Sequence, residues 1–334
     1  MIADQKPIAV IGAGIAGLSC AARLLAAGHS VEVIEKSRGP GGRAATRRGD
    51  DWQCDHGAQY FTARSPAFLA AVEEWRAAGV VAEWQPRLLA VDIDGPVRKG
   101  QDELRLVGTP RMSAISRHLA AGLPVRYETR VTALGLEGDD WILDTEEHGV
   151  LEQAYSGVIL TLPSQQAFAL LVEASPGLAD LAAQNPMRGC WALMARYAED
   201  PGLDFDAAFV NVGALSWVAR DSSKPGRPEG HVWLLHAPAA DDIGGESEEE
   251  LAEVAEAMIE EFSQLGAPRP DDFVLHRWRF ADCPDAPEVG SVWDPVDRIG
   301  IAGDWLMGGR IEGAWLSGRQ LADAVIASAL EEED

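Results

Sequence analysis

Three glycines and one glutamate near the start of the chain have the spacing of a dinucleotide-binding turn. The glycines are Gly12, Gly14 and Gly17 in AVIGAGIAGL, and Glu35 lies 18 residues after the third. The first permits a tight turn, the second lets the backbone approach a pyrophosphate, and the third lets helix and strand pack closely. The carboxylate of Glu35 can accept both hydroxyls of an adenosine ribose, and an acid here disfavours a ribose 2′-phosphate.

A second loop with related chemistry stands near the other end of the chain, in GDWLMGGRIEGAWLSG at residues 303–318. Asp304 follows a short apolar run, so its carboxylate is expected at a strand end, where it can accept cofactor hydroxyls. The helix predicted to start near Gly313 directs a positive charge of roughly one half at its neighbour. Glu312 has two interpretations, as a cap of that helix or as a cofactor contact.

The loop KSRGPGGRAATRR, directly after Glu35, distinguishes between dinucleotides. Gly42 and Arg43 predict a compact turn with a fixed positive charge, whereas the two arginines that end the loop resemble a solvated basic stretch. NAD does not require such a turn, but FAD carries a longer ribityl-flavin arm that backbone amides and Arg43 can hold. The residues therefore predict FAD. A non-covalent link is expected, because the C-terminal glycine segment contains no cysteine.

Strands and helices must bring these loops together. PIAVIG and VEVIEK, around residues 7–12 and 31–36, predict buried strands, and the helix between them ends at Gly28. VILTLP at 158–163 and RIGIA at 298–302 predict two more. From about residue 166, CWALMARY, LSWVARD, HVWLLHA and FVLHRWRF predict strands joined by turns, and SEEE at 247–250 opens a helix. This second pattern favours an antiparallel sheet with one helix, forming the substrate side of a cleft.

The strand–GxGxxG–Glu pattern followed by RGPGGR resembles the flavin-containing amine oxidase superfamily. DHGAQYFTAR at 55–64, WLLHA at 233–237 and the segment 303–318 resemble the renalase family within it, particularly its bacterial members. The resemblance runs essentially from end to end. It implies an α/β fold in which a glutathione-reductase-like FAD-binding Rossmann domain, residues 1–65, 105–165 and 291–334, is interleaved with an antiparallel-sheet-plus-helix substrate domain, residues 66–104 and 166–290.

The motifs and the resemblance together indicate which residues contact FAD. In the first part of the chain they are Gly12, Gly14, Ile15, Ala16, Gly17, Glu35, Lys36, Gly42, Arg43, Ala58, Gln59 and Val131. In the C-terminal segment they are Gly303, Asp304, Ile311, Glu312, Gly313 and Ala314.

His236, Tyr60 and Gln59 are the candidate catalytic residues. A histidine on an apolar strand face is more often a core residue, but the resemblance places His236 over the flavin in the substrate pocket. Tyr60 either offers an aromatic wall and a hydroxyl or is an ordinary strand aromatic, and Gln59 can hydrogen-bond an amide. Whether the pocket is also lined by Arg64, Trp278 and Phe280 stays open.

The resemblance implies an FAD oxidase of renalase type. Its donors would be the 2- and 6-dihydro isomers of NAD(P)H, which give a hydride to flavin N5, and O2 would take the electrons to form NAD(P)+ and H2O2. Such a donor needs no base, because loss of hydride leaves an aromatic pyridinium. The alternatives are a flavin amine oxidase acting on a small amine and an FAD-binding protein without turnover.

Lysine is scarce, and this bears on the choice between those activities. The chain contains Lys6, Lys36, Lys99 and Lys224. The first two flank the nucleotide fold, and the others are expected in polar turns, Lys224 within the solvated loop SSKPGRPEG at 222–230. None is suited to a place beside flavin N5, where many amine oxidases of the superfamily have a lysine.

Composition limits the partners. A net charge of −25 over 334 residues disfavours nucleic acid and anionic membranes, so the expected partners are a dihydronicotinamide nucleotide and O2. The four cysteines lack metal-ligand spacing, which predicts free thiols, no metal and a reducing compartment. Without an apolar run of roughly 18 residues, a cytoplasmic enzyme is expected. Oligomeric state and the preference between NAD and NADP isomers stay open.

Overall fold

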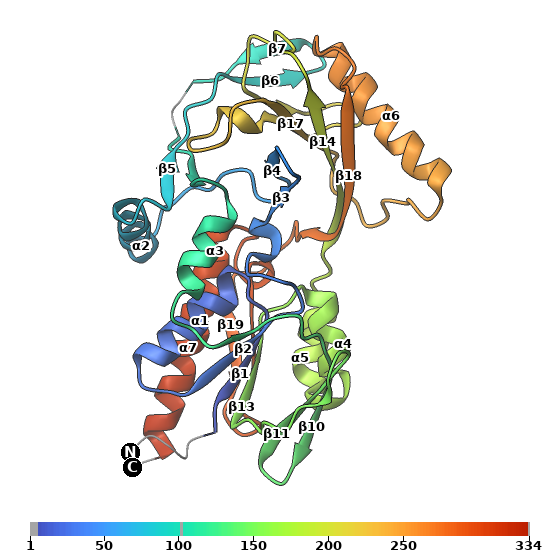
Figure 1. The fold of residues 1–334 in the computed structure, drawn as a ribbon. Helices are drawn as coiled ribbons and strands as arrows, with labels where there is room; N and C mark the ends of the chain where they lie inside the picture. Colours follow the sequence, from blue (N-terminus) through green and yellow to red (C-terminus); the bar gives the residue numbers. More distant parts are fainter. Residues whose placement is uncertain (1–5, 101–102, 333–334) are drawn as a thin grey trace.

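The computed structural model describes residues 6–100 and 103–332, so the outermost residues of the predicted FAD-binding segments lie outside it. One large sheet contains β1 (Ile8–Ile11), β2 (Val31–Ile34), β9 (Val125–Arg126), β13 (Gly157–Leu160), β19 (Ser291–Asp294) and β20 (Ile299–Ala302). Its spatial order is β19-β20-β13-β1-β2-β9, and every pair is parallel except β19 with β20 (Figure 1). This is a Rossmann-like arrangement.

Helices cover one face of this sheet, and helices with a small sheet cover the other (Figure 1). The first group is α1 (Ile15–Ala26), α3 (Ser113–Ala120) and α7 (Ile311–Glu332). The second group is α4 (Ser164–Ala174) and α5 (Pro176–Ala183), with the three-stranded sheet β10 (Val131–Glu137), β11 (Asp140–Thr145) and β12 (Gly149–Val150).

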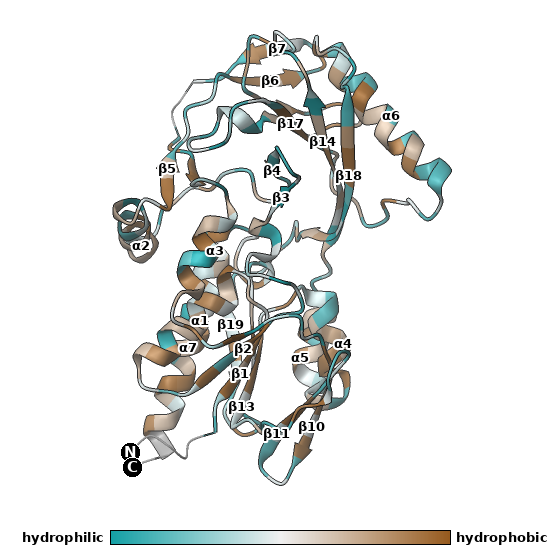
Figure 2. Ribbon diagram, viewed as in Figure 1, coloured by the Kyte–Doolittle hydropathy of each residue, from teal (hydrophilic) through white to brown (hydrophobic). Residues whose placement is uncertain are grey.

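The residues of β1 alternate between these two faces. Val10 packs with Leu18 of α1 and Leu321 of α7, whereas Ile11 packs in the opposite core with Leu171 of α4. Burial on both faces explains why the strands are unbroken apolar runs rather than alternating ones. Figure 2 shows this hydrophobic character along β1 and β13.

The second large sheet contains β6 (Leu88–Asp92), β7 (Gly95–Arg98), β14 (Arg188–Tyr197), β15 (Ala207–Val210), β16 (Trp217–Arg220), β17 (His231–His236) and β18 (Asp272–Asp282). Its order is β18-β14-β17-β16-β15-β6-β7, antiparallel except for the β15–β6 pair. Helix α6 (Glu248–Gln264) covers one face, where Phe262 packs against Trp233. As predicted, Ser247 caps this helix by accepting the backbone N–H of Glu250 at 3.2 Å.

Short elements complete the fold. They are η1 (Gly42–Ala44), β3 (Thr46–Arg48), β4 (Gln53–Asp55), α2 (Pro66–Ala77), β5 (Val81–Glu83), β8 (Leu106–Gly108), η2 (Asp221–Ser223) and η3 (Asp304–Leu306). The mixed α/β fold with a Rossmann-like part is confirmed. Helices α4 and α5 follow the expected boundary at residue 165, yet Leu171 and Leu178 join the core of the Rossmann-like sheet. We therefore propose that this boundary lies after α5.

The cysteines and helices of the described ranges add two simple facts. All four cysteines are buried and unpaired. Burial raises the pKa of Cys190 to about 12, so this thiol stays protonated and is a poor nucleophile. None of the helices in residues 6–100 and 103–332 has the length and apolar character needed to span a membrane.

Helices α1 and α7 pack so closely that their contact requires glycine. A Cβ atom on Gly318 would lie 2.1 Å from the carbonyl oxygen of Ala16. We expect Gly318→Ala to lower the free energy of unfolding of the FAD-bound protein by about 1–3 kcal/mol, the usual cost of overpacking.

Gly177→Ala is the matched control, because an added Cβ in α5 meets nothing within 4 Å. The higher helix propensity of alanine should raise the free energy of unfolding by up to ~1 kcal/mol. Denaturant unfolding of both variants measures the difference, and equal stabilities would contradict the close α1–α7 contact.

Candidate active site

A cavity of about 1190 Å³ lies between the two large sheets. Its size exceeds the roughly 300–1,000 Å³ of pockets for drug-sized ligands and suits a dinucleotide. The predicted cofactor residues that line it are Gly12, Gly14, Ile15, Ala16, Glu35, Lys36, Gly42, Arg43, Ala58, Gly303, Asp304, Ile311 and Ala314. His236 also lines the cavity, so the predicted catalytic histidine faces the same space as these predicted cofactor residues.

The turn between β1 and α1 leaves open space where a pyrophosphate would bind. Gly14 is the N-cap of α1, and no side chain caps this helix. A Cβ on Gly14 would meet nothing within 4 Å, whereas one on Gly17 would lie 2.0 Å from the carbonyl oxygen of Gly12. Gly17 therefore serves packing and does not line the cavity, while the uncapped helix start offers free N–H groups to an anion.

Glu35 lines the cavity directly after β2. Its two carboxylate oxygens accept the backbone N–H groups of Ala13 and Ser37, each at 2.8 Å. These contacts orient the carboxylate at the cavity wall, in a position to accept ribose hydroxyls. Lys36 lies beside it, with Nζ 3.3 Å from Oε1 of Gln166.

Arg43 and Asp304 form a two-pronged ion pair that joins η1 to η3. Arg43 Nη1 donates to Asp304 Oδ2 at 2.8 Å, and Arg43 Nη2 donates to Oδ1 at 2.5 Å. The sequence predicted a fixed positive charge at Arg43 and a hydroxyl acceptor at Asp304, but not that the two side chains pair with each other. The two side chains are 261 residues apart in the chain and meet only in the folded structure. Because their charges are opposite, the pairing neutralises both.

Four other predicted cofactor residues lie away from the cavity lining. Val131 packs against the core of the Rossmann-like sheet, and its neighbour Arg130 lines the cavity instead. Glu312 accepts the backbone N–H groups of Arg64 and Ser65, at 3.2 and 2.6 Å, so it neither caps its own helix nor contacts the cavity. Helix α7 begins at Ile311, close to the predicted start near Gly313, and a Cβ added to Gly313 would lie 1.9 Å from the carbonyl oxygen of Met307. The fourth is Gln59.

Two of the three predicted catalytic residues, Gln59 and Tyr60, do not line the cavity. The amide of Gln59 is buried, donating to the carbonyl oxygens of Asp55 and Gly57 and accepting from Lys224 Nζ at 3.1 Å. Tyr60 packs into a core beside Trp217, with ring centroids 5.6 Å apart. Gly57 and Ala58 line the cavity, whereas the side chains of Gln59 and Tyr60 are held by these partners behind it.

His236 has one defined protonation state. Its Nε2 lies 3.0 Å from the carbonyl oxygen of His56, which also accepts the indole N–H of Trp278 at 2.8 Å. A carbonyl only accepts, so the hydrogen-bond network assigns the proton to Nε2 and leaves Nδ1 as an acceptor. Burial lowers the pKa of His236 from 6.5 to about 4, so the ring is neutral near pH 7.

Aromatic rings from β18 form the wall beside this histidine. Trp278 and Phe280 line the cavity, together with His276, whose ring centroid lies 4.6 Å from that of Trp278. Arg64 instead points outward and pairs with Glu103 at 2.9 Å. Among the described residues, no three His, Cys, Asp or Glu side chains gather in a way that would hold a metal ion.

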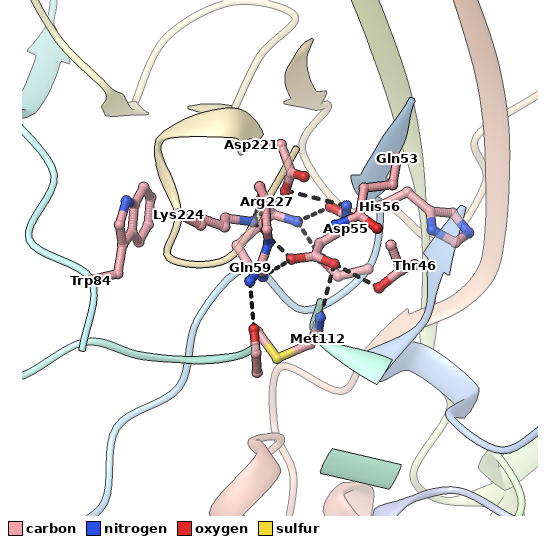
Figure 3. Close-up of polar contacts among 12 residues, drawn as sticks. Thr46, Gln53, Asp55, His56, Gln59, Trp84, Met112, Asp221, Lys224 and Arg227 are labelled. Carbon is pink, nitrogen blue, oxygen red and sulfur yellow. Dashed lines mark hydrogen bonds and ion pairs between the residues drawn. The ribbon is translucent and has the colours of Figure 1, made fainter. Parts of the chain in front are cut away.

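A group of buried charges that the sequence did not predict lies behind the same wall. Lys224 and Arg227, expected in a solvated loop, have fully buried side chains that pair with Asp55 (Figure 3). Hydropathy could not find them, because a polar loop has the same composition whether it is solvated or folded against buried partners. One feature of the sequence could have indicated these ion pairs. Acids and bases stand in otherwise polar segments, with Asp55 in DHGAQYFTAR and Asp221 three residues before Lys224.

Comparisons with known proteins agree with this geometry. The model of the NAD(P)-binding Rossmann-like domain matches residues 10–75, and that of flavin containing amine oxidoreductases matches residues 77–326. Cyclohexylamine oxidase from Brevibacterium oxydans IH-35A has a similar structure, with a TM-score of 0.73 over 98% of this chain and 100% of that one. Putrescine oxidase bound to putrescine gives a TM-score of 0.67 over 97% and 99%. Both are 14% identical to this chain, so they show the fold alone.

Curated relatives match over a short stretch. The L-amino acid oxidase Cdc18 of Crotalus durissus cumanensis is 46% identical over 54 residues, which is 16% of this chain and 11% of that protein. The L-amino-acid oxidase of Daboia russelii is 51% identical over 45 residues, 14% of this chain and 9% of that protein. The match thus spans about a tenth of these oxidases. With the cavity and the long family match together, the chain belongs to the flavin-containing amine oxidoreductases and binds FAD.

Proposed function

We propose that this protein is an FAD oxidase of renalase type, acting on the 2- and 6-dihydro isomers of NAD(P)H. When bound, FAD supplies the redox chemistry, taking a hydride from the donor and passing it with one further proton to O2 to give H2O2. The chain itself binds the donor, orients the nicotinamide and excludes water. His236 is the proposed catalytic residue that contacts the nicotinamide end.

The charge on the cavity wall is the observation that carries this proposal. Arg279 and Arg310 line the cavity, and neither forms an ion pair with another side chain of the described ranges. The acids that line it are already engaged: Glu35 by backbone N–H groups, Asp304 by Arg43, and Asp282 by Arg188. Free cations beside engaged carboxylates suit a donor with a pyrophosphate better than an ammonium.

The state of His236 supports the same proposal. A neutral ring with a free Nδ1 can accept the N–H of a carboxamide and so orient a nicotinamide. It carries no charge that would repel a pyridinium product. No proton has to leave the donor before hydride transfer, so the site needs no strong base.

A flavin amine oxidase is the second candidate, and the family supports it directly. Structural neighbours include cyclohexylamine and putrescine oxidases, and the short sequence matches are L-amino-acid oxidases. An amine must lose a proton before it can give up hydride, and His236 could accept that proton. The remaining candidate, an FAD-binding protein without turnover, would show no donor reaction.

Anaerobic stopped-flow mixing separates the three candidates. We expect the dihydro-NAD(P) isomers to bleach the flavin band rapidly, and ordinary NADH and a panel of small amines to leave it essentially unchanged. Readmission of O2 should restore the band and release H2O2 equal to the donor consumed. Rapid bleaching by an amine instead would establish the second candidate, and a flavin that none of these donors reduces would favour the third.

Replacement of His236 tests its role. We expect His236→Ala to keep FAD bound but to slow flavin reduction by about 10- to 100-fold, since orientation of the donor is lost. His148→Ala, at an exposed histidine, is the control. The pKa of about 4 keeps His236 neutral as pH falls, so the wild-type rate should stay level from neutral pH downward and drop only near pH 4. A decline centred near 6.5, the ordinary histidine value, would remove this role.

The two unpaired arginines determine donor affinity in this proposal. We expect Arg279→Ala and Arg310→Ala each to raise the donor dissociation constant by about fivefold, equivalent to ~1 kcal/mol for one exposed charge pair. The limiting rate of flavin reduction should change little. Arg117→Ala removes an exposed arginine of α3 outside the cavity and is the control. If added salt weakens donor binding equally in all three variants, the arginines do not contact the donor.

A further inference from the structure

Four buried charged side chains form a cluster behind the cavity wall: Asp55, Asp221, Lys224 and Arg227 (Figure 3). Lys224 Nζ lies 2.9 Å from Asp221 Oδ1 and 3.4 Å from Asp55 Oδ2, and Arg227 Nη2 contacts the same Asp55 oxygen. The side chains are at most 1% exposed. Burial raises the pKa of Asp55, but Lys224 and Arg227 outweigh it and hold this pKa below its ordinary value.

Asp55 joins this cluster to other parts of the fold. Its Oδ1 accepts the hydroxyl of Thr46 at 2.6 Å and the backbone N–H of Met112 at 3.0 Å. Its own backbone N–H donates to Asp221 Oδ1 at 3.2 Å. The carboxylate is thereby held by groups from β3, the start of α3 and the loop after η2.

The cluster holds both ends of the segment His56–Ala58. Asp55 precedes this segment as one of the four charges, and Gln59 follows it, with Oε1 accepting from Lys224 at 3.1 Å. Gln59 Nε2 also donates to the carbonyl oxygens of Asp55 and Gly57, closing the segment into a tight turn. Asp55 and Gln59, which flank residues 56–58, therefore both contact the buried ammonium of Lys224. We call residues 56–58 the wall segment.

The same segment forms the cavity wall and orients the proposed catalytic group. Gly57 and Ala58 line the cavity, and the carbonyl oxygen of His56 accepts from both His236 and Trp278. The backbone N–H of Ala58 donates to the carbonyl oxygen of Arg43 at 2.9 Å, so the segment also lies against the cofactor loop. A shift of this turn would move the acceptor away from two side chains that face the cofactor.

A group of buried charges is an expensive way to fill a core. Apolar residues of similar volume often stabilise a protein as well or better, because charges lose their hydration. Hydrogen bonds between charged groups are, however, strongly directional and admit few alternative arrangements. This combination fits a device that fixes geometry rather than one that adds stability.

We infer that Lys224, with Asp221, is a positioning residue of the active site: it holds Gln59 and Asp55, and thereby sets the His56 carbonyl that orients His236 and Trp278. This inference uses the proposed role of His236 but is independent of which donor the enzyme oxidises. Lys224 is not among the residues that line the cavity. It acts through the wall segment.

Two variants separate this role from simple stability. Lys224→Met with Asp221→Asn removes one charge of each sign, so the Asp55–Arg227 pair remains balanced. Gln59→Met keeps all four charges and removes the link from Lys224 together with the two hydrogen bonds from Gln59 Nε2 to the carbonyl oxygens of Asp55 and Gly57. Lys99→Met, at an exposed lysine, is the control.

The readout is nitrogen–proton correlation spectroscopy of the FAD-bound protein, labelled at tryptophan and histidine. In both test variants we expect the indole proton of Trp278 to shift upfield and to exchange with water at least about tenfold faster, because its acceptor has moved. The ring N–H of His236 should respond in the same way. The internal reference is the indole of Trp141, which packs in the core of the Rossmann-like sheet and donates to the carbonyl oxygen of Asp297 at 3.0 Å. Its signal should not change.

The charge-balanced double variant adds a titration test. The groups that face the His236–His56 wall are Lys224, His276, Arg47 and Asp55. Lys224 is the cation that acts on His236 itself and lowers its pKa, so its removal should move the His236 titration midpoint upward from about 4. The midpoint thus reports the loss of the Lys224 charge beside His236, whereas the N–H signals of Trp278 and His236 report the positioning role.

The outcomes decide the inference without reference to the donor. Signals of Trp278 and His236 equal to those of Lys99→Met, in folded FAD-bound variants, would overturn it. A simultaneous change at Trp141 would also overturn it, because the cluster would then hold the whole fold rather than this wall. If the double variant does not fold, Gln59→Met decides alone. If the local shifts occur but none of the candidate donors reduces the flavin, the proposed function fails while this inference stands.

Discussion

Arg43 is the residue through which the separate parts of the active site are joined. Its guanidinium pairs with Asp304 of η3 and donates to the carbonyl oxygen of Ala281 at the end of β18, at 3.3 Å. Its own carbonyl oxygen accepts from Ala58 in the wall segment. One residue of the first dinucleotide loop thus contacts the C-terminal loop, the second sheet and the wall. A charged fork with several partners has few equivalent arrangements, so the contact sets how the two sheets enclose the cavity.

Buried charge is used in two ways around this cavity. The Arg43–Asp304 pair lies at the lining and leaves a neutral surface beside the cofactor site. The Asp55–Lys224–Asp221–Arg227 cluster lies one layer deeper and is linked to the lining through Gln59 and the backbone of residues 56–58. Loss of one partner from such a cluster typically costs about 3–5 kcal/mol, since an unpaired charge stays buried. The geometry of the wall and the stability of the second sheet are therefore coupled.

The fold alone does not choose the donor, because related structures oxidise different molecules. In the proposed function, the choice depends on charge at the cavity wall, where Arg279 and Arg310 are unpaired within the described ranges and the acids are engaged. It also depends on His236, whose burial keeps the ring neutral. The protein as a whole carries a net charge of −25, so positive charge in the cavity is a local arrangement rather than a consequence of composition.

Local sequence determined the elements whose physics is local. The apolar runs of β1 and β2, the glycine turn before α1, the cap at Ser247 and the acid at Glu35 depend on short-range geometry, so their positions and the FAD site followed from spacing. Tertiary structure decided which side chains reach the cavity. Gln59, Tyr60 and Glu312 turn away from it, and Lys224 and Arg227 leave their polar loop to become buried. These outcomes depend on partners more than a hundred residues away in most cases, as in the contact of Lys224 with Asp55, which no local pattern encodes.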